Sequence, residues 1–338
     1  MTTFRLRGLS RPLGLNPRRR ATPDAGPPGD TEAPSVPQNL VATAVSSSQI
    51  DLTWDASTDN VAVTGYNIYR DDVLVDTRPT NSYSDTGLDP GTEYEYEVSA
   101  FDAASNESAR SAPDSATTHQ AIVTDGLVAE WRFDEGAGQV LTDYSGNGNH
   151  GTLGANSGSS TDDPTWTPQG LSFDGGDFVG FAGNLGVSGT QARSVIFVAN
   201  TTGANRFAAE WIGNGTNGRR WTLRDQASGD ELRLEIAGAG HTSALALTNA
   251  WRFFACTQAG ANINTGVLYL DGSAAAIPTS ATIDTTGNFS ITTLIGAPYG
   301  NPVVAYGLVY NRALTPAEVE QNRAALKSIL AARSITLP

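Results

Sequence analysis

Apolar and polar residues alternate in many short stretches along this chain. Residues 50–54 and 94–100 place an apolar side chain at every second position. Residues 66–75 show the same alternation around a turn made of two aspartates. A period of two is typical of β-strands that bury one face. About seven such strands fit between residues 34 and 118, which predicts a β-sandwich.

Residues 126–338 carry a longer series of strand patterns, each bounded by Gly, Asn or Asp turn signals. About a dozen strands fit this length, which predicts one large antiparallel sandwich. Near its end, Thr315-Pro316-Ala317-Glu318 has the spacing of a capping box with proline at the first helical position. We therefore expect one short helix over residues 316–332, the only substantial helix of the protein.

The segments outside these two regions differ from them in composition. Residues 1–20 are a basic peptide interrupted by Pro and Gly, and residues 21–33 form a Pro/Gly-rich linker. A first domain at 34–118 and a second domain at 126–338 are then joined by a connector at 119–125.

Three motifs in the first domain occur together in one known family. Trp54 ends "IDLTW", "VTGYNIYR" follows as a third strand, and Tyr94 ends "LDPGTEY". In these motifs residues 34–118 resemble a fibronectin type III domain, with Trp54 as its buried tryptophan and Tyr94 as its tyrosine corner. The resemblance implies seven strands and a Tyr94 hydroxyl that bonds upstream backbone. Its plainest role is that of a spacer, because a fold alone does not specify a function.

Four motifs of the second domain also occur in the order seen in one known family. They are "WRFDEG…DYSGNGNHGT", the "FDGGD" turn, the "LYLDG" hairpin and the closing "YNRALTPAEV". In this order and spacing they resemble the laminin-G-like, concanavalin A-like lectin/glucanase family. The expected fold class is therefore all-β: a fibronectin type III sandwich plus a larger concanavalin A-like jelly-roll sandwich with one short C-terminal helix.

Charge narrows the range of partners. The chain of 338 residues has a formal net charge of −14, although residues 1–20 contain six arginines and no acid. An acidic body repels nucleic acid and anionic membranes, so we expect neither as a partner. No stretch approaches the roughly 18 apolar residues of a membrane span. The single cysteine, Cys256 in "RFFACTQ", excludes an internal disulfide and indicates a small core residue.

Two acidic loops of the second domain suggest a calcium site. "TDYSGNGNHG" supplies Asp143 and Asn147, and "FDGGDF" supplies Asp174 and Asp177. Hard cations bind clustered oxygen ligands of these types. If the two loops meet at one rim of the sandwich, they would hold one Ca²⁺, as the family resemblance implies. The alternative is that these Asx-Gly loops only make turns.

Aromatic residues close to loops suggest a glycan platform. Lectin-like sites place aromatic rings against the C–H-rich faces of sugars. The candidates are Trp166, Trp211, Trp221 and Tyr299. The alternative is that each of these rings is packed in the protein interior. A cell-surface glycan is the partner that such a platform implies.

Hydrolytic chemistry lacks a motif. Retaining glycosidases need two carboxylates about 5–5.5 Å apart, which alternate positions on a strand would provide. Asp134-Glu135 and Asp230-Glu231 are adjacent pairs, so their side chains would point to opposite faces. We therefore predict that the protein is not an enzyme.

The basic peptide at residues 1–20 suggests a docking segment. It lacks the apolar stretch of a secretory signal. Its apolar positions could add a strand to a partner's sheet edge, and its arginines could pair with carboxylates. The alternative is that it folds back on its own acidic domains. The expected docking residues are Phe4, Arg5, Leu6, Arg7, Leu9, Leu13, Leu15, Arg18, Arg19 and Arg20.

These observations lead first to a non-enzymatic bacteriophage virion-surface protein, a head decoration or fibre. Its N-terminal peptide would dock to a virion structural protein such as the capsid, and its lectin-like domain would attach to the host surface. One alternative is an extracellular bacterial adhesin or carbohydrate-binding accessory protein. Another is a purely structural virion stabiliser or tail component. The sequence leaves the oligomeric state open, a homo-oligomer included.

Overall fold

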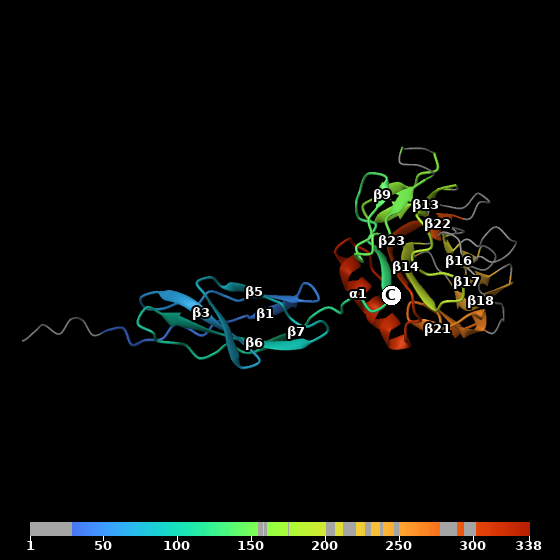
Figure 1. The fold of residues 1–338 in the computed structure, drawn as a ribbon. Helices are drawn as coiled ribbons and strands as arrows, with labels where there is room; N and C mark the ends of the chain where they lie inside the picture. Colours follow the sequence, from blue (N-terminus) through green and yellow to red (C-terminus); the bar gives the residue numbers. More distant parts are fainter. Residues whose placement is uncertain are drawn as a thin grey trace, which may run out of the picture. The chain divides into compact units, whose positions relative to one another are not determined.

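The structure is a computed structural model, and nearly all of its regular structure is β. It describes residues 29–154, 158, 161–174, 176–200, 207–211, 221–226, 231–236, 239–246, 250–277, 289–293 and 302–338. Within these residues there are several sheets, a short 3-10 turn at Ile263–Thr265 and one α-helix near the C-terminus (Figure 1). The predicted fold class is confirmed. No helix among these residues is long and apolar enough to cross a bilayer.

Seven strands lie between residues 41 and 117, the number predicted. One sheet has three strands in the order β1-β2-β5, and another has four in the order β4-β3-β6-β7. Their bounds are β1 Val41–Ala44, β2 Gln49–Thr53, β3 Val63–Arg70, β4 Val73–Arg78, β5 Ser82–Thr86, β6 Glu93–Asp102 and β7 Asp114–Thr117.

Two of the predicted anchor residues of this region take their expected roles. Trp54 is buried, and its ring meets Tyr66 edge-on with the ring centroids 5.3 Å apart. The Tyr94 hydroxyl accepts a hydrogen bond of 3.0 Å from the backbone N–H of Asp89. This bond fixes the turn that leads into β6.

Sixteen described strands follow, and they form two larger sheets. The first has the order β18-β17-β16-β15-β22-β13-β10-β9, and the second has the order β11-β12-β23-β14-β19-β20-β21, with β8 also paired to β23. The bounds are β8 Leu127–Trp131, β9 Val140–Leu141, β10 Gly151–Leu153, β11 Thr165–Thr167, β12 Gly170–Ser172, β13 Phe178–Phe181, β14 Arg193–Asn200, β15 Phe207–Trp211, β16 Trp221–Gln226, β17 Glu231–Ile236, β18 Ala239–Ala246, β19 Trp251–Gln258, β20 Gly266–Leu270, β21 Ser273–Ala276, β22 Phe289–Thr293 and β23 Val303–Tyr310.

One hydrophobic core joins these two sheets into a sandwich. Trp131 of β8 is fully buried and belongs to the second sheet. Its ring stacks on Phe289 of the first sheet at a centroid distance of 5.6 Å and touches Phe181 at 4.5 Å. Gly307 lies opposite Trp131, and a Cβ there would come within 2.6 Å of the Phe197 ring. Position 307 therefore favours glycine, because a larger residue would collide with the buried rings of Phe197 and Trp131.

The middle strands of the second sheet are buried on both faces. In β14, Val195 and Phe197 belong to the core between the sheets, whereas Ile196 and Val198 belong to a second core on the other face. This double burial explains why the sequence reads as nearly continuous apolar runs there. Cys256 of β19 is also fully buried, as predicted.

The C-terminal helix covers the outer face of the second sheet. Helix α1 runs from Pro316 to Ala331, one residue shorter than predicted (Figure 1). Its apolar side faces the second core through Val319, Leu326 and Leu330. Thr315 caps it in the predicted capping box with Glu318.

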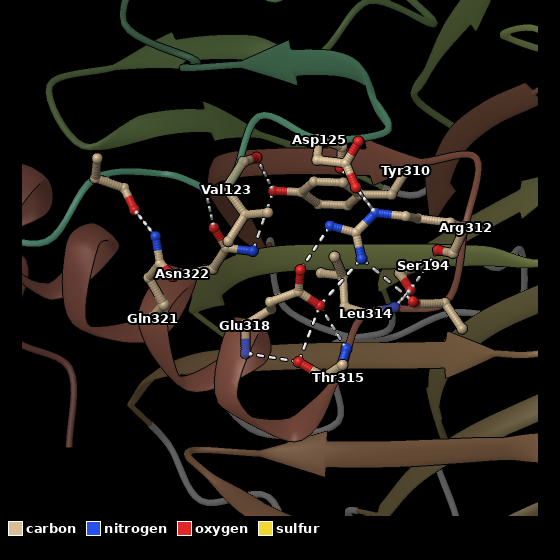
Figure 2. A network of polar contacts seen from close by, with 12 residues as sticks. Val123, Asp125, Ser194, Tyr310, Arg312, Leu314, Thr315, Glu318, Gln321 and Asn322 are labelled. Atoms are coloured by element: carbon tan, nitrogen blue, oxygen red, sulfur yellow. Dashed lines mark hydrogen bonds and ion pairs between the residues drawn. The ribbon is translucent and has the colours of Figure 1, made fainter.

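The connector is fixed to this helix and to β23. The Tyr310 hydroxyl donates a hydrogen bond of 3.0 Å to the backbone carbonyl of Val123. The backbone N–H of Val123 donates one of 2.9 Å to the amide oxygen of Asn322 (Figure 2). The Asn322 amide nitrogen also donates to the Tyr310 hydroxyl at 3.0 Å. Asn322 is fully buried, so these bonds satisfy polar groups that water does not reach. Residues around Val123 thus pack as part of the second domain.

Arg312 links the same connector to the start of helix α1. Its guanidinium forms two hydrogen bonds with the Glu318 carboxylate, of 2.7 and 3.0 Å, and an ion pair of 2.8 Å with Asp125 (Figure 2). The Arg312 hydrogen bonds, followed by the backbone N–H of Thr315, lower the pKa of Glu318 from 4.5 to about 2. The helix start therefore depends on a charged carboxylate.

Replacing that carboxylate should weaken the second domain in a pH-dependent way. Glu318→Gln should lower the free energy of unfolding by about 1 kcal/mol at neutral pH, since the amide keeps part of the cap and loses the charge. The folded state depresses the pKa of Glu318, so its stabilisation is complete above pH 4.5 and disappears as the pH falls toward about 2. Urea titrations across this range measure the difference.

Glu320→Gln is the matched control. Glu320 lies on the same helix and pairs with Arg323, but its side chain is 52% exposed. An exposed pair of this kind contributes only about 0.5 kcal/mol. Equal losses in the two variants would contradict a special role for Glu318.

Candidate functional site

The first predicted calcium loop is held together by its own aspartate. Asp143 is buried, and its carboxylate accepts hydrogen bonds from the backbone N–H groups of Glu130, Ser145 and Asn149 at 2.8 to 3.0 Å. Burial alone would raise the pKa of Asp143, but these hydrogen bonds lower it below its usual value. The carboxylate therefore orders the loop as an anion.

Asn147 supports the same loop from its outer side. Its amide nitrogen donates to the carbonyl of Leu127 at 3.1 Å and to the hydroxyl oxygen of Ser145 at 3.0 Å. These contacts tie the loop to β8. In this structure, Asp143 and Asn147 thus perform the turn-making role that was the alternative to calcium binding.

The second predicted calcium loop has a different electrostatic character. Asp177 is almost completely buried, and one of its carboxylate oxygens accepts a hydrogen bond of 2.6 Å from the backbone N–H of Asp174. Burial first, and then the carboxylates of Asp174 and Asp163, raise the pKa of Asp177 to about 6. A cation would relieve this repulsion, and carboxylate oxygens are the ligands that Ca²⁺ binds. A cation near Asp177 would therefore lower its pKa.

The structure does not bring the two loops into one compact set of carboxylates. Within the described ranges, the group of three acidic ligands with oxygens inside 4.8 Å of one another is Asp30, Asp59 and Asp102. Asp143 is not grouped with Asp174 and Asp177. Calcium binding by Asp174 and Asp177 stays a prediction.

The carboxylate cluster in the first domain was missed by the sequence analysis. Asp102 at the end of β6 is 3% exposed and accepts a hydrogen bond of 2.7 Å from the Asn106 amide. The same amide donates at 3.1 Å to the backbone carbonyl of Asp30, which the sequence placed in a linker. Because residues 30, 59 and 102 are far apart in sequence, only the fold brings them together.

Of the predicted glycan platform, Trp166 is the residue whose side chain is described. It lies in β11, half-buried against the core between the sheets, and its indole N–H donates to the carbonyl of Gly138 at 2.8 Å. Trp211 of β15 and Trp221 of β16 are direct partners in the antiparallel register. Their side chains, and the whole of Tyr299, lie outside the described part.

The docking peptide also lies outside the described residues, which begin at residue 29. Its ten predicted contact residues, from Phe4 to Arg20, therefore stay predictions.

Comparison with known proteins identifies the first domain. Residues 35–117 match the family model of the fibronectin type III domain. The match spans all seven strands of the two small sheets. The resemblance found in the sequence is confirmed for this domain.

Curated relatives are enzymes that act on polysaccharides, judged by their names. An alpha-amylase from Niallia circulans is 54% identical over 89 residues, which cover 26% of this chain and 7% of the amylase. Exoglucanase B from Cellulomonas fimi is 51% identical over 89 residues, 26% of this chain and 8% of the exoglucanase. Chitinase A1 from Niallia circulans is 44% identical over 124 residues, 36% of this chain and 18% of the chitinase. The chain therefore spans less than a fifth of each of these three relatives.

These relatives correct the functional interpretation of the sequence. The expectation of a bacteriophage virion-surface protein, a capsid decoration or head fibre, is wrong, because the relatives are bacterial enzymes. That expectation relied on the basic peptide, on the lack of a secretory signal, a catalytic carboxylate pair and a disulfide, and on the lectin-like resemblance. The alternative of a carbohydrate-binding accessory protein agrees better with the relatives.

The raised pKa of the buried Asp177 predicts how stability depends on pH and on calcium. Its folded-state pKa is raised from 3.8 to about 6, so the free energy of unfolding should fall as the pH rises between these values. Asp177→Asn should abolish this fall, because the amide keeps the size and hydrogen-bond acceptor of the carboxylate without its charge. Millimolar Ca²⁺ at neutral pH should restore stability to the wild type and not to the variant.

Thermal unfolding with Ca²⁺ or with a chelator measures both effects. If the unfolding temperature of the wild type depends on pH but does not change with Ca²⁺, the calcium prediction is wrong and the pH prediction stands.

Proposed function

We propose that this chain is a non-catalytic, carbohydrate-binding accessory region of an extracellular bacterial system that degrades polysaccharides. The observation that carries this proposal is the 54% identity over 89 residues with an alpha-amylase. That length is close to the fibronectin type III match at residues 35–117. Since an exoglucanase and a chitinase share the similarity, the proposal concerns polysaccharide processing in general and not one substrate.

The second domain is the part proposed to bind carbohydrate. It is a large β-sandwich, and the order of its motifs resembles a lectin-like family. Trp211 and Trp221, which are partners on neighbouring strands, stay candidates for an aromatic platform. The first domain would act as a spacer, because its seven strands match a module that many unrelated proteins share.

Charge and the lack of a catalytic motif favour this role. The net charge of −14 suits a neutral polysaccharide better than an anionic one. The described strands of the second domain carry no two carboxylates two positions apart, which hydrolysis by the two-carboxylate mechanism would need; the alternating Glu93, Glu95 and Glu97 lie in β6 of the first domain. We therefore propose binding without cleavage.

Retention on insoluble polysaccharides tests the proposed function. The full chain should sediment with at least one of starch, cellulose and chitin, and soluble sugar of the same type should release it. The supernatant should gain no reducing ends over the same period. A chain that stays in the supernatant with all three polymers would contradict the proposal, and release of reducing ends would contradict its non-catalytic part.

A further inference from the structure

An exposed tyrosine stands out on the edge of the second domain. Residues 140–144 alternate in burial: Leu141 and Asp143 are buried, whereas Val140 and Tyr144 are 53% and 42% exposed. Among the described residues, eight large apolar side chains are strongly exposed, and Tyr144 is the aromatic one. A ring in this position contributes little to the core, which leaves it available for a ligand.

The ring of Tyr144 is held in place from one side. The guanidinium of Arg132 lies over it, 4.2 Å from the ring centroid. Arg132 is held in turn by Glu130, whose carboxylate oxygen accepts a hydrogen bond of 2.9 Å from the Arg132 side chain. The buried hydroxyl of Tyr306 donates to the same carboxylate oxygen. The backbone N–H of Tyr144 also bonds the Glu130 carbonyl at 2.8 Å.

This arrangement fixes the ring before any ligand arrives. A ring that is already ordered loses little conformational entropy when a ligand stacks on it, which favours binding. The contact with Arg132 occupies one face, so the solvent-exposed part of Tyr144 is what a ligand can reach.

The charges around the ring are mainly negative. Burial first, and then the carboxylates of Asp134 and Glu135, raise the pKa of the Tyr144 phenol. Asp134 is exposed, and one oxygen of Glu135 accepts a hydrogen bond of 2.6 Å from the Thr142 N–H. The charge of Arg132 is already engaged by Glu130. Carboxylate acceptors beside an exposed ring suit hydroxyl groups and repel anions.

We propose that Tyr144, Arg132 and Asp134 form a binding subsite for a neutral, pyranose-containing polysaccharide. The sugar would stack its C–H-rich face on the exposed ring of Tyr144, and its hydroxyls would donate to the Asp134 carboxylate. Arg132 is a positioning residue that holds the ring. The inference rests on the proposed function and locates a subsite for it outside the predicted tryptophan platform.

A neutral polysaccharide is favoured over other occupants. Polymers of uronic acids and nucleic acids carry negative charge, which the carboxylates of Asp134 and Glu135 oppose. A protein partner would usually bury a larger apolar surface than one ring and Val140 provide. One exposed ring flanked by acceptors matches the size of a single sugar unit.

Affinity electrophoresis of the full chain in gels that contain soluble starch, barley β-glucan, glycol chitin or gellan tests the subsite. The wild type should be retarded by at least one neutral polymer and not by gellan. Tyr144→Ala should weaken that retardation about tenfold, and Tyr144→Phe should keep it because the ring is retained. Arg132→Gln should weaken it less than Tyr144→Ala does.

Tyr83→Ala is the matched control. Tyr83 lies in β5 with the guanidinium of Arg78 5.4 Å from its ring centroid, so it repeats the Arg–Tyr contact in the first domain. Thermal unfolding of each variant separates lost binding from lost folding. If the Tyr144→Ala variant fails to fold, Tyr144→Phe still tests the inference. A folded Tyr144→Phe variant that no longer binds would contradict stacking of the sugar on the ring.

The outcomes distinguish this inference from the proposed function. Wild-type binding that Tyr144→Ala leaves unchanged overturns the subsite and leaves the accessory role intact. Preferential binding of gellan overturns the assignment to neutral sugars. Absence of binding to every polymer overturns both proposals.

Discussion

Burial of the second large sheet on both faces is the constraint on which the second domain depends. Strands β14, β19 and β23 place one set of side chains against the first sheet and the other set against helix α1. Neither face can be left open, because each carries a row of large apolar residues. The helix and the connector are therefore needed to cover the outer face, and the Tyr310–Asn322–Val123 hydrogen bonds hold them there.

The exposed chemistry follows from the same packing. Trp131 faces the core between the sheets, so the next residue back along β8, Glu130, faces the opposite side. There it meets Tyr306 and Arg132, and Arg132 in turn lies over Tyr144. The polar groups at this edge are thus positioned by a buried ring on the other face of the strand.

Local patterns were enough to predict much of the fold and little of the sites. The period of two, the capping box at Thr315 and the corner at Tyr94 each involve neighbours in sequence, and each was confirmed. Asp30 and Asp102, or Arg132 and Tyr144, meet only through tertiary structure, so no local signal marks them. Asp143 illustrates a different difficulty. The residue types that suit a cation also suit a turn, and only the structure shows that backbone N–H groups donate to this carboxylate.

The central claim is that the second domain binds neutral carbohydrate while the fibronectin type III domain is a spacer. Hydrogen–deuterium exchange of the full chain, with and without a saturating neutral oligosaccharide, tests it most directly. The account predicts slower exchange in peptides of the second domain, including residues 132–144, and unchanged exchange in residues 35–117. Slower exchange confined to residues 35–117 would contradict it.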